Sequence, residues 1–512
     1  MDQVGRSKGY LNLRNTRRLV QLLSAGLWIY LFFMTRVKVS ALPVDIFIAT
    51  DPLIAAITLG AAQILVPSLV AGLILAVFTM IFGRFFCGWL CPLGLILDGA
   101  AKIFPPDPGR FSKKTSEKMH RWKYYLLVAI LFGSLLSSQW AYLFDPLVIL
   151  YRGLATGIYP VYAAIMPQQA LPGELGADFH EVVFIPLALL LGVIGLTALA
   201  PRFYCRYICP LGALYGVLAR KSLFRRRVTD ACDACKPFPV KTQCKQSCRM
   251  DAIPSNTRHT RNHECIRCFT GHSECHQKGI SFEFVGLKKE KVDKPINLGR
   301  RQFIITGAAG LSLAPVVSLA HFHRRDPRLV VRPPRVLDED TFLDQCVRCG
   351  MCVQACPTQT LQFTFLDSGL AGLWTPALTP RIGGCIADCN ACGRVCPTGA
   401  IPQFKIDEGD KWSVKMGTAV LEKGRCISYA DNLACKKCID ICPTKAFIAE
   451  PSDGTHPYRP VSIDYVRCVG CGLCEFACRK IVFGKPAVLT FSHGQGQPTV
   501  LRDRPTSDIQ GS

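Results

Sequence analysis

The chain has 512 residues, enough for several domains, and 49% of them are hydrophobic, which predicts that part of the chain lies in lipid. Its formal net charge of +23 does not require a nucleic-acid partner, because basic residues also gather beside membrane spans on the cytoplasmic side. The 27 cysteines do not suit a secreted disulfide scaffold, since such scaffolds are short and most cysteines here are grouped with two or three residues between them.

Four apolar stretches in the first half are each long enough to cross the roughly 30 Å hydrocarbon core of a membrane. These predicted spans are residues 19–37, 67–86, 124–142 and 181–200. Lys and Arg are concentrated before the first span, in 101–123 and in 201–227, so the positive-inside bias predicts that the N-terminus is cytoplasmic. The apolar stretches 53–65 and 146–166 are interpreted as interfacial or re-entrant pieces.

The first half also contains a repeat. The segment RFFCGWLCPLG at 84–94 recurs as RFYCRYICPLG at 202–212, and a DPL tripeptide precedes each copy. Two copies of a two-span unit predict a pseudo-twofold axis along the membrane normal. In C-x3-C on a helix, both thiols lie on one face, one turn apart. We expect the repeated cysteines to form one redox or metal site, the alternative being that they pack as small buried residues. They are Cys87, Cys91, Cys205 and Cys209.

Residues 222–295 are polar and rich in cysteine, and we expect them to form a cytoplasmic ferredoxin-like segment. Two motifs approach the pattern C-x2-C-x2-C-x3-C-P, in which three cysteines bind one cluster and the fourth reaches a second cluster. The first motif has an insertion and the second lacks its third cysteine, so one or two [4Fe-4S] clusters are expected. The candidate ligands are Cys232, Cys235, Cys244, Cys248, Cys265, Cys268 and Cys275. His272, near the gap, is either an imidazole ligand or a surface residue.

Arg300 and Arg301 precede an uncharged run, residues 303–320, in an order that resembles a bacterial twin-arginine export signal. We interpret residues 296–322 as an internal signal that serves as a fifth span and delivers the rest of the chain to the periplasm. A buried soluble helix is the alternative, which the length and glycine content of this run leave open.

Residues 323–490 contain four consecutive cysteine motifs, three of which end in Cys-Pro. Four such motifs in a row predict four [4Fe-4S] clusters rather than zinc sites. The predicted ligands are Cys346, Cys349, Cys352, Cys356, Cys385, Cys389, Cys392, Cys396, Cys426, Cys435, Cys438, Cys442, Cys468, Cys471, Cys474 and Cys478. The spacing does not reveal which fourth cysteine completes which cluster. Residues 491–512 are expected to be a disordered tail.

These motifs carry a family resemblance. Residues 1–295, with the spans, two C-x3-C-P motifs and the cysteine-rich segment, resemble the NapH/MauN membrane ferredoxin-type proteins. Residues 296–490, with the paired arginines and four cluster motifs, resemble the NapG/MauM periplasmic ferredoxin-type proteins. The resemblance implies a module in the bacterial inner membrane that oxidises quinol and passes electrons to a periplasmic reductase, dehydrogenase or its cytochrome.

The expected fold is an α-helical membrane domain with four spans, as two two-span repeats in residues 1–221, plus a fifth span, together with two ferredoxin-like α+β iron–sulfur domains. The expected function is electron transfer, with quinone as a further candidate cofactor. We find no haem-attachment motif, dinucleotide fingerprint or hydrolytic constellation, so no catalytic residue is assigned. The alternative function is assembly of a periplasmic metalloenzyme, and a redox sensor ranks below both.

Overall fold

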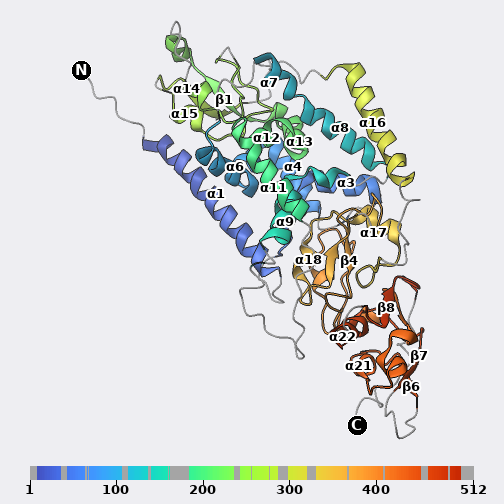
Figure 1. Cartoon of the computed structure of the whole chain (residues 1–512). Helices are drawn as coiled ribbons and strands as arrows, with labels where there is room; N and C mark the ends of the chain where they lie inside the picture. The colour runs from blue at the N-terminus through green and yellow to red at the C-terminus, as the bar shows by residue number, and fades with distance from the viewer. Residues whose placement is uncertain are drawn as a thin grey trace. The chain divides into compact units, whose positions relative to one another are not determined.

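A computed structural model divides the chain into two compact units, which are described separately (Figure 1). Unit 1 comprises Met1–Phe33, Ile46–Leu150 and Ile185–Ala314, and unit 2 comprises Met34–Asp45, Tyr151–Phe184 and Pro315–Ser512. The structure describes all residues except 1–7, 36–42, 64–65, 67–68, 107–112, 137–139, 159–160, 162–183, 236–242, 255–256, 276, 286–297, 320–329, 366–367, 407–409, 451–458, 482–484 and 498–512. The predicted C-terminal tail therefore lies mostly outside the described residues.

Helices dominate unit 1. Those lying wholly or partly in it are α1 (Lys8–Met34), α2 (Ile46–Ala49), α3 (Pro52–Ala62), α4 (Val70–Phe82), α5 (Phe85–Trp89), α6 (Pro92–Ile103), α7 (Lys113–Met119), α8 (Trp122–Ser134), α9 (Pro146–Gly157), α11 (Phe184–Gly195), α12 (Phe203–Tyr207), α13 (Pro210–Leu218), α14 (Gln243–Gln246), α15 (Thr270–Ser273) and α16 (Arg300–Leu319). Strand β1 (Phe224–Val228) pairs antiparallel with β2 (Ile280–Phe284) in the cysteine-rich segment.

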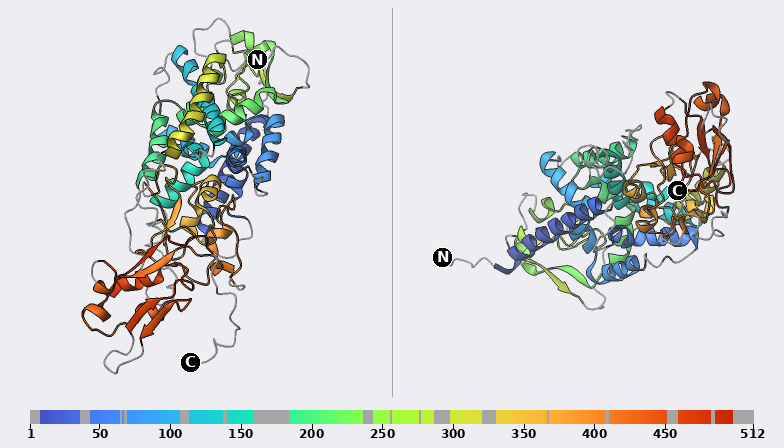
Figure 2. Two further views of the ribbon diagram at one scale, coloured as in Figure 1. Left: turned by 90° about the vertical axis from the view of Figure 1, so that its right-hand side faces the viewer. Right: turned by 90° about the horizontal axis from the view of Figure 1, so that it is seen from below.

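Unit 2 is built from short elements, coloured orange to red in Figures 1 and 2. Its helices are α17 (Glu339–Gln345), α18 (Met351–Ala355), α19 (Ala391–Arg394), α20 (Ile427–Ala430), α21 (Lys437–Asp440) and α22 (Leu473–Ile481). Its strands form antiparallel pairs, β3 (Leu361–Phe363) with β4 (Pro376–Leu378), β5 (Thr418–Leu421) with β8 (Val488–Phe491), and β6 (Phe447–Glu450) with β7 (Arg459–Ile463). Cysteine side chains, many of them buried, are distributed between these elements.

The prediction of membrane spans is wrong. Among the described residues, no helix is both long enough and apolar enough to cross a membrane. The predicted spans 67–86, 124–142 and 181–200 coincide largely with α4, α8 and α11, which have 13, 13 and 12 residues. At a rise of 1.5 Å per residue, each helix covers about 20 Å, less than the roughly 30 Å hydrocarbon core.

The two longer helices do not restore the membrane prediction. Helix α1 has 27 residues and α16 has 20, but neither of them is both long enough and apolar enough to cross a membrane. The membrane fold class with four spans and a fifth is therefore corrected, and so is the multi-pass inner-membrane location with a cytoplasmic N-terminus and a periplasmic C-terminal domain.

The sequence repeat of unit 1 recurs in its local structure. Asp51 is the N-cap of α3, and its carboxylate accepts hydrogen bonds from the backbone of Leu53 at 2.8 Å and Ile54 at 3.3 Å. Asp145 accepts the equivalent bonds before α9, from Leu147 at 2.9 Å and Val148 at 3.0 Å. Each DPL tripeptide is thus a helix start with Asp as cap and Pro in the first turn.

A buried carboxylate, Glu264, joins the cysteine-rich segment to the helices of unit 1. It accepts hydrogen bonds from Arg84 Nη1 at 3.0 Å, from Lys123 Nζ, and from the Tyr124 hydroxyl at 3.0 Å. The side chains of Glu264, Arg84 and Lys123 are each no more than 1% exposed. Burial alone would raise the pKa of Glu264, but Lys123, His120 and Arg84 hold it well below its usual value. Glu264 is therefore ionised and balances several buried cations.

Glu264→Gln is expected to lower the free energy of unfolding of unit 1 by about 3–5 kcal/mol, because it leaves two buried cations without their carboxylate. Denaturant titration of the full chain measures this difference. The control is Glu117→Gln, whose side chain is 57% exposed and pairs with Arg261 at 2.8 Å. That change should cost less than about 1 kcal/mol. Similar losses in both variants would contradict a special role for the buried network.

Candidate iron–sulfur sites

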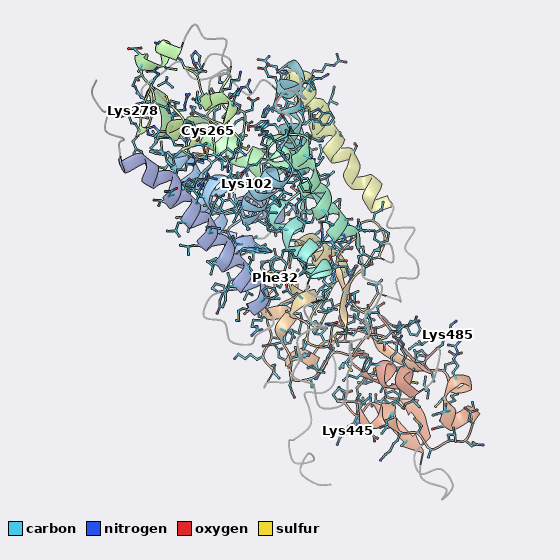
Figure 3. The ribbon with its side chains drawn as sticks, turned by 60° about the vertical axis from the view of Figure 1, so that its left-hand side comes forward. Phe32, Lys102, Cys265, Lys278, Lys445 and Lys485 are labelled. Atoms are coloured by element: carbon cyan, nitrogen blue, oxygen red, sulfur yellow. The ribbon has the colours of Figure 1, made fainter. Side chains whose placement is uncertain are left out.

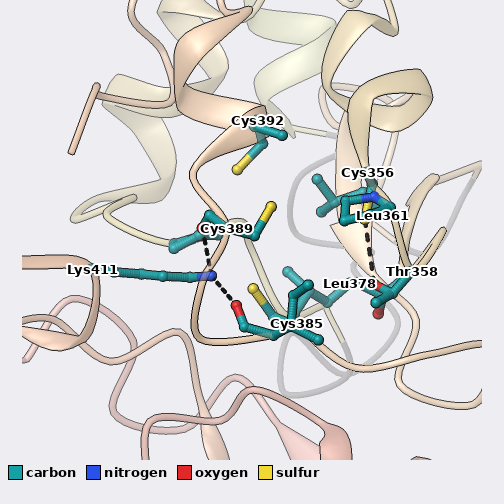
Figure 4. A pocket seen from close by; sticks show the side chains of 13 residues that line it. Cys356, Thr358, Leu361, Leu378, Cys385, Cys389, Cys392 and Lys411 are labelled. Carbon is teal, nitrogen blue, oxygen red and sulfur yellow. Dashed lines mark hydrogen bonds between the residues drawn. The ribbon is translucent and has the colours of Figure 1, made fainter. Parts of the chain in front are cut away.

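Two sets of four cysteines enclose cavities in the first part of unit 2. Site A is defined as Cys346, Cys349, Cys352 and Cys396, which line one pocket. Site B is defined as Cys385, Cys389, Cys392 and Cys356, which line a second pocket (Figure 4). In each set, three thiols come from one motif and the fourth comes from the other motif. The fourth cysteine of each of the first two motifs thus lies with the first three cysteines of the other motif.

The second part of unit 2 repeats this arrangement. Site C is defined as Cys468, Cys471, Cys474 and Cys442, and site D as Cys426, Cys435, Cys438 and Cys478. In site C, burial raises the pKa of Cys474 well above its usual value, and the neighbouring thiols, including Cys442, raise it further. In site D, burial and then Cys426, Cys435 and Cys478 raise the pKa of Cys438 to about 12.

The cysteine loops of the first and fourth motifs share a left-handed backbone at two positions. In the first motif, Arg348 and Gly350 have φ of 54° and 86°, and in the fourth motif Gly470 and Gly472 have φ of 72° and 78°. A Cβ at Gly350 would lie 2.5 Å from Phe363 Cζ, so only glycine fits that position. This left-handed pattern wraps the chain around the space that the thiols enclose.

Backbone and side-chain donors surround the thiols. The Sγ atoms of Cys396, Cys442 and Cys478 accept hydrogen bonds from the backbone N–H groups of Ile401, Ala446 and Ala487 at 3.3–3.4 Å; these N–H groups come from the segment that follows each fourth cysteine. Hydrogen bonds to cluster sulfurs are among the factors that set reduction potentials.

Lys411 closes one side of site B. Its Nζ donates to the carbonyl of Cys389 at 2.7 Å and to that of Ile386, as Figure 4 shows. The side chain is 2% exposed. Burial raises the pKa of Cys385 to about 11, and the charge of Lys411 opposes that shift. Lys411 therefore places a cation beside thiols that must be ionised to bind iron; the cysteine spacing gave no sign of it.

Sites B and C lie next to each other. The backbone N–H of Cys385 donates to the carbonyl oxygen of Cys471 at 2.8 Å. A Cβ at Gly384 would lie 2.6 Å from Leu473 Cδ2 and 2.7 Å from its Cα, so the two motif loops are in close contact. The thiol of Cys385 also contributes to the raised pKa of Cys471, after burial and the thiol of Cys442.

The cysteine-rich segment of unit 1 keeps part of the same design. Burial, followed by Cys268 and Cys265, raises the pKa of Cys248 to about 11, which places the fourth cysteine of its first motif beside the second motif. Arg267 and Phe269 have φ of 53° and 56°, the same left-handed pair seen in unit 2. When these two left-handed residues are aligned with those of unit 2, Gly271 occupies the position of the third cysteine, which the second motif lacks.

The other predicted cluster ligands of the cysteine-rich segment differ in burial; Cys265 is labelled in Figure 3. Cys232 is buried, Cys244 and Cys275 are half-buried, and the side chain of Cys235 lies outside the described residues. The Nδ1 atom of His272 is hydrogen-bonded to the carbonyl oxygen of Ile280. That ring nitrogen supports strand β2, so an imidazole ligand would have to use Nε2.

The repeated cysteines of unit 1 are brought together. After burial, Cys205 and Cys87 are the largest causes that raise the pKa of Cys91, and the same two thiols raise that of Cys209. The prediction that the cysteines of each C-x3-C share one helix face is wrong. Cys87 and Cys205 lie in α5 and α12, whereas Cys91 and Cys209 cap the following helices, because proline begins each of those.

Two further observations complete the sites. Within the described part of the chain, no three His, Cys, Asp or Glu side chains are grouped closely enough to hold a single metal ion. Sites A and B, each with four thiols around one pocket, match the donor set of a [4Fe-4S] cluster.

The paired arginines predicted to be an export signal, Arg300 and Arg301, begin α16, and that role stays a prediction.

Comparisons with known proteins identify the cofactor. Residues 64–110 and 182–229 match a family model described as a 4Fe-4S binding domain, and residues 342–362 match another model with the same description. The first model covers both C-x3-C-P motifs, and the second covers the first motif of unit 2. The prediction of [4Fe-4S] clusters is confirmed. No solved structure matches the chain.

Relatives match part of the chain. The chain is 34% identical to the ferredoxin-type protein NapG of Escherichia coli K12 over 218 residues, 40% of this chain and 90% of that protein. It is 40% identical to the methylamine utilization ferredoxin-type protein MauM of Paracoccus denitrificans over 185 residues, 35% of this chain and 77% of that protein. MauM of Methylorubrum extorquens is 33% identical over 208 residues, 38% of this chain and 90% of that protein. The chain therefore belongs to the NapG/MauM family of ferredoxin-type 4Fe-4S electron-transfer proteins.

Proposed function

We propose that unit 2 conducts electrons along four [4Fe-4S] clusters in the order A, B, C, D. The observation that carries this order is the hydrogen bond from Cys385 N–H to the Cys471 carbonyl at 2.8 Å, which joins a ligand of site B to a ligand of site C. Crossed fourth cysteines support the A–B and C–D neighbours. The order differs from the order of the motifs in the sequence, because the fourth motif, not the third, meets site B.

The N-terminal 295 residues are proposed to be a second ferredoxin-type module, related to NapH/MauN, that is fused to the first and supplies its electrons. Two matches to a 4Fe-4S binding domain within this half support the assignment. We propose a quinol as the electron donor and a partner redox enzyme or its cytochrome as the acceptor. A quinol releases protons with its electrons, so its oxidation requires a nearby group that can exchange a proton.

A buried pair of carboxyls in unit 1 is suited to that role. Asp51 and Asp145 are fully buried and interact with each other through their side chains. Burial and the charge of Asp145 raise the pKa of Asp51 well above its usual value. This shift favours the protonated form of Asp51, so the pair is suited to exchange a proton. The hydroxyl-bearing side chains of Tyr204 and Tyr215 lie within electrostatic range of both Asp145 and the repeated cysteines.

The quinol donor is tested by Asp51→Asn, which keeps the helix cap but removes the ionisable group. Stopped-flow reduction of the clusters by menadiol should slow at least about tenfold, within the contribution expected of a proton-transfer group. Reduction by dithionite should not change. The control Asp338→Asn alters another N-cap aspartate, that of α17 in unit 2, and should affect neither rate. Equal rates with menadiol in the Asp51 variant and the native chain would contradict the proposed proton exchange.

The crossed ligands are tested by pairs of substitutions. Cys349→Ser with Cys396→Ser alters only site A and should remove about four iron atoms per chain. Cys349→Ser with Cys356→Ser alters sites A and B and should remove about eight. Iron and sulfide analysis of the anaerobically purified chain measures both losses. If each motif instead completes its own cluster, the first pair should remove about eight iron atoms and the second pair about four.

The contact between sites B and C is tested at Gly384. Gly384→Ala introduces a Cβ about where Leu473 lies, so the two loops must separate, while all four clusters should still assemble. We expect a weaker magnetic interaction between the reduced clusters of B and C in electron paramagnetic resonance spectra. Gly424→Ala is the matched control, since nothing lies within 4 Å of its added methyl group. An unchanged interaction in the Gly384 variant would contradict the proposed order.

A further inference from the structure

The second cysteine motif of unit 1 keeps the spacing of a cluster loop but has glycine in place of one ligand. The stretch CIRCFTGHSEC has cysteine at the first, second and fourth ligand positions of C-x2-C-x2-C-x3-C and Gly271 at the third. We propose that Cys248, Cys265 and Cys268, named site E, hold a [4Fe-4S] cluster in which one iron has no ligand from the chain. That iron is exchangeable and open to a small external ligand such as water or a thiol.

Backbone contacts bring Cys248, the fourth cysteine of the first motif, to this loop. The Arg261 N–H donates to the Ala252 carbonyl at 2.8 Å, and the Ala252 N–H donates to Cys248 Sγ at 3.2 Å. The thiol of Cys248 lies within electrostatic range of Cys265 and Cys268. In unit 2, too, the segment that follows a fourth cysteine donates a backbone N–H to its sulfur. Site E thus follows the crossed pattern of unit 2.

The other fourth cysteine, Cys275, leads the chain back to the first motif. In the segment that follows it, a Cβ at Gly279 would lie 3.0 Å from the backbone nitrogen of Cys232. The Thr229 N–H also donates to the Gly279 carbonyl at 3.0 Å. The crossed pattern therefore assigns Cys275 to the set that begins with Cys232, which leaves site E with three thiols.

The backbone at Gly271 does not require glycine. Its φ lies outside the left-handed region, and a Cβ there would lie 3.8 Å from Ile253 Cδ1 and 3.9 Å from the Cys244 carbonyl oxygen, both ordinary contacts. Gly271 is half-buried, whereas Cys352, at the same position of the first motif in unit 2, is buried. A side chain fits at this position, and a small molecule from solvent can reach it.

The residues on either side of Gly271 differ in their partners. Thr270 is 5% exposed, and its hydroxyl has no hydrogen-bond partner within the described part of the chain. A buried polar group without a partner is costly, and a ligand bound at the adjacent position would supply one. His272 instead has its Nδ1 bonded to the carbonyl of Ile280, which holds the ring against strand β2. We therefore assign no iron to His272.

An open iron leads to a defined reaction. Loss of one ferrous ion from the oxidised [4Fe-4S] cluster leaves three irons, each bound to its own cysteine, and all four sulfides. A one-electron oxidant such as ferricyanide then converts this three-iron cluster to its all-ferric form and becomes ferrocyanide. Ferrous iron and a reductant reverse both steps. The inference rests on cluster loading of the proposed ferredoxin-type module in unit 1, but not on a quinol donor or on the order of sites A to D.

Iron exchange in the full chain, reconstituted anaerobically with iron and sulfide, is the first test. Ferricyanide should release about one iron per chain and produce the electron paramagnetic resonance signal of a three-iron cluster. Isotopically labelled ferrous iron and dithionite should then restore about one iron per chain. Retention of all iron, with no three-iron signal, would overturn the proposal.

Substitution of Gly271 locates the open iron. Gly271→Cys supplies the missing thiol and should abolish both the exchange and the three-iron signal, with the iron content unchanged. Gly271→Ala is the matched control, since it adds a side chain without a ligand and should behave as the native chain does. A three-iron signal that persists in Gly271→Cys would overturn the proposal. Exchange that appears only in His272→Ala would also overturn it, because the imidazole would then hold the iron.

The external ligand is tested with a small thiol. β-Mercaptoethanol added to the dithionite-reduced chain should shift the electron paramagnetic resonance spectrum of site E, because the thiolate binds the open iron. The same addition should leave the spectrum of Gly271→Cys unchanged. A native spectrum that does not respond to the thiol, or an equal shift in Gly271→Cys, would contradict an iron that is open to external ligands.

Discussion

The fourth thiolate of each cluster site is the constraint on which the rest of this molecule depends. A cysteine loop supplies three ligands in a few residues, and a [4Fe-4S] cluster requires four. In unit 2 the fourth comes from the neighbouring motif, so α18 must pack near α19 and α21 near α22. Burial raises the pKa of Cys346, one of the three cysteines that the first loop supplies, to about 11, which opposes its ionisation. Iron binding must offset that cost, so cluster loading and folding are coupled.

Unit 1 contains two copies of one motif that exchange their arginines. Arg202 of the second copy donates to the carbonyl of Cys87, and Arg84 Nη2 of the first copy lies beside Gly212. The buried Arg84, three residues before Cys87, pairs with Glu264, the residue just before the Cys265 loop. A single ion pair thereby links the repeated cysteines to the next cysteine motif. Charge balance in a buried environment fixes the relative position of these two elements.

Sequence spacing predicted the iron–sulfur cofactor and the motif cysteines, because ligand spacing is local. It did not predict the crossed partners, the contact of Cys385 with Cys471, or Lys411, since these depend on how distant loops pack. The membrane spans failed for a specific reason. Residues 67–86 form one continuous apolar stretch in the sequence, which predicted a single span. In the structure, helix α4 ends before Gly83, whose φ is 77°, and α5 begins at Phe85. Pro92 likewise separated Cys87 from Cys91, so the expected single helix face does not exist.

The most direct test of the central claim measures how fast the reduced cluster of site A relaxes in electron paramagnetic resonance, with and without its neighbours. Cys389→Ser removes the cluster of site B, and Cys435→Ser removes that of site D. If electrons pass through A, B, C and D in that order, loss of the B cluster should slow the relaxation of A, and loss of the D cluster should leave it unchanged. A site A signal that responds to the loss of D but not of B would contradict the proposed order.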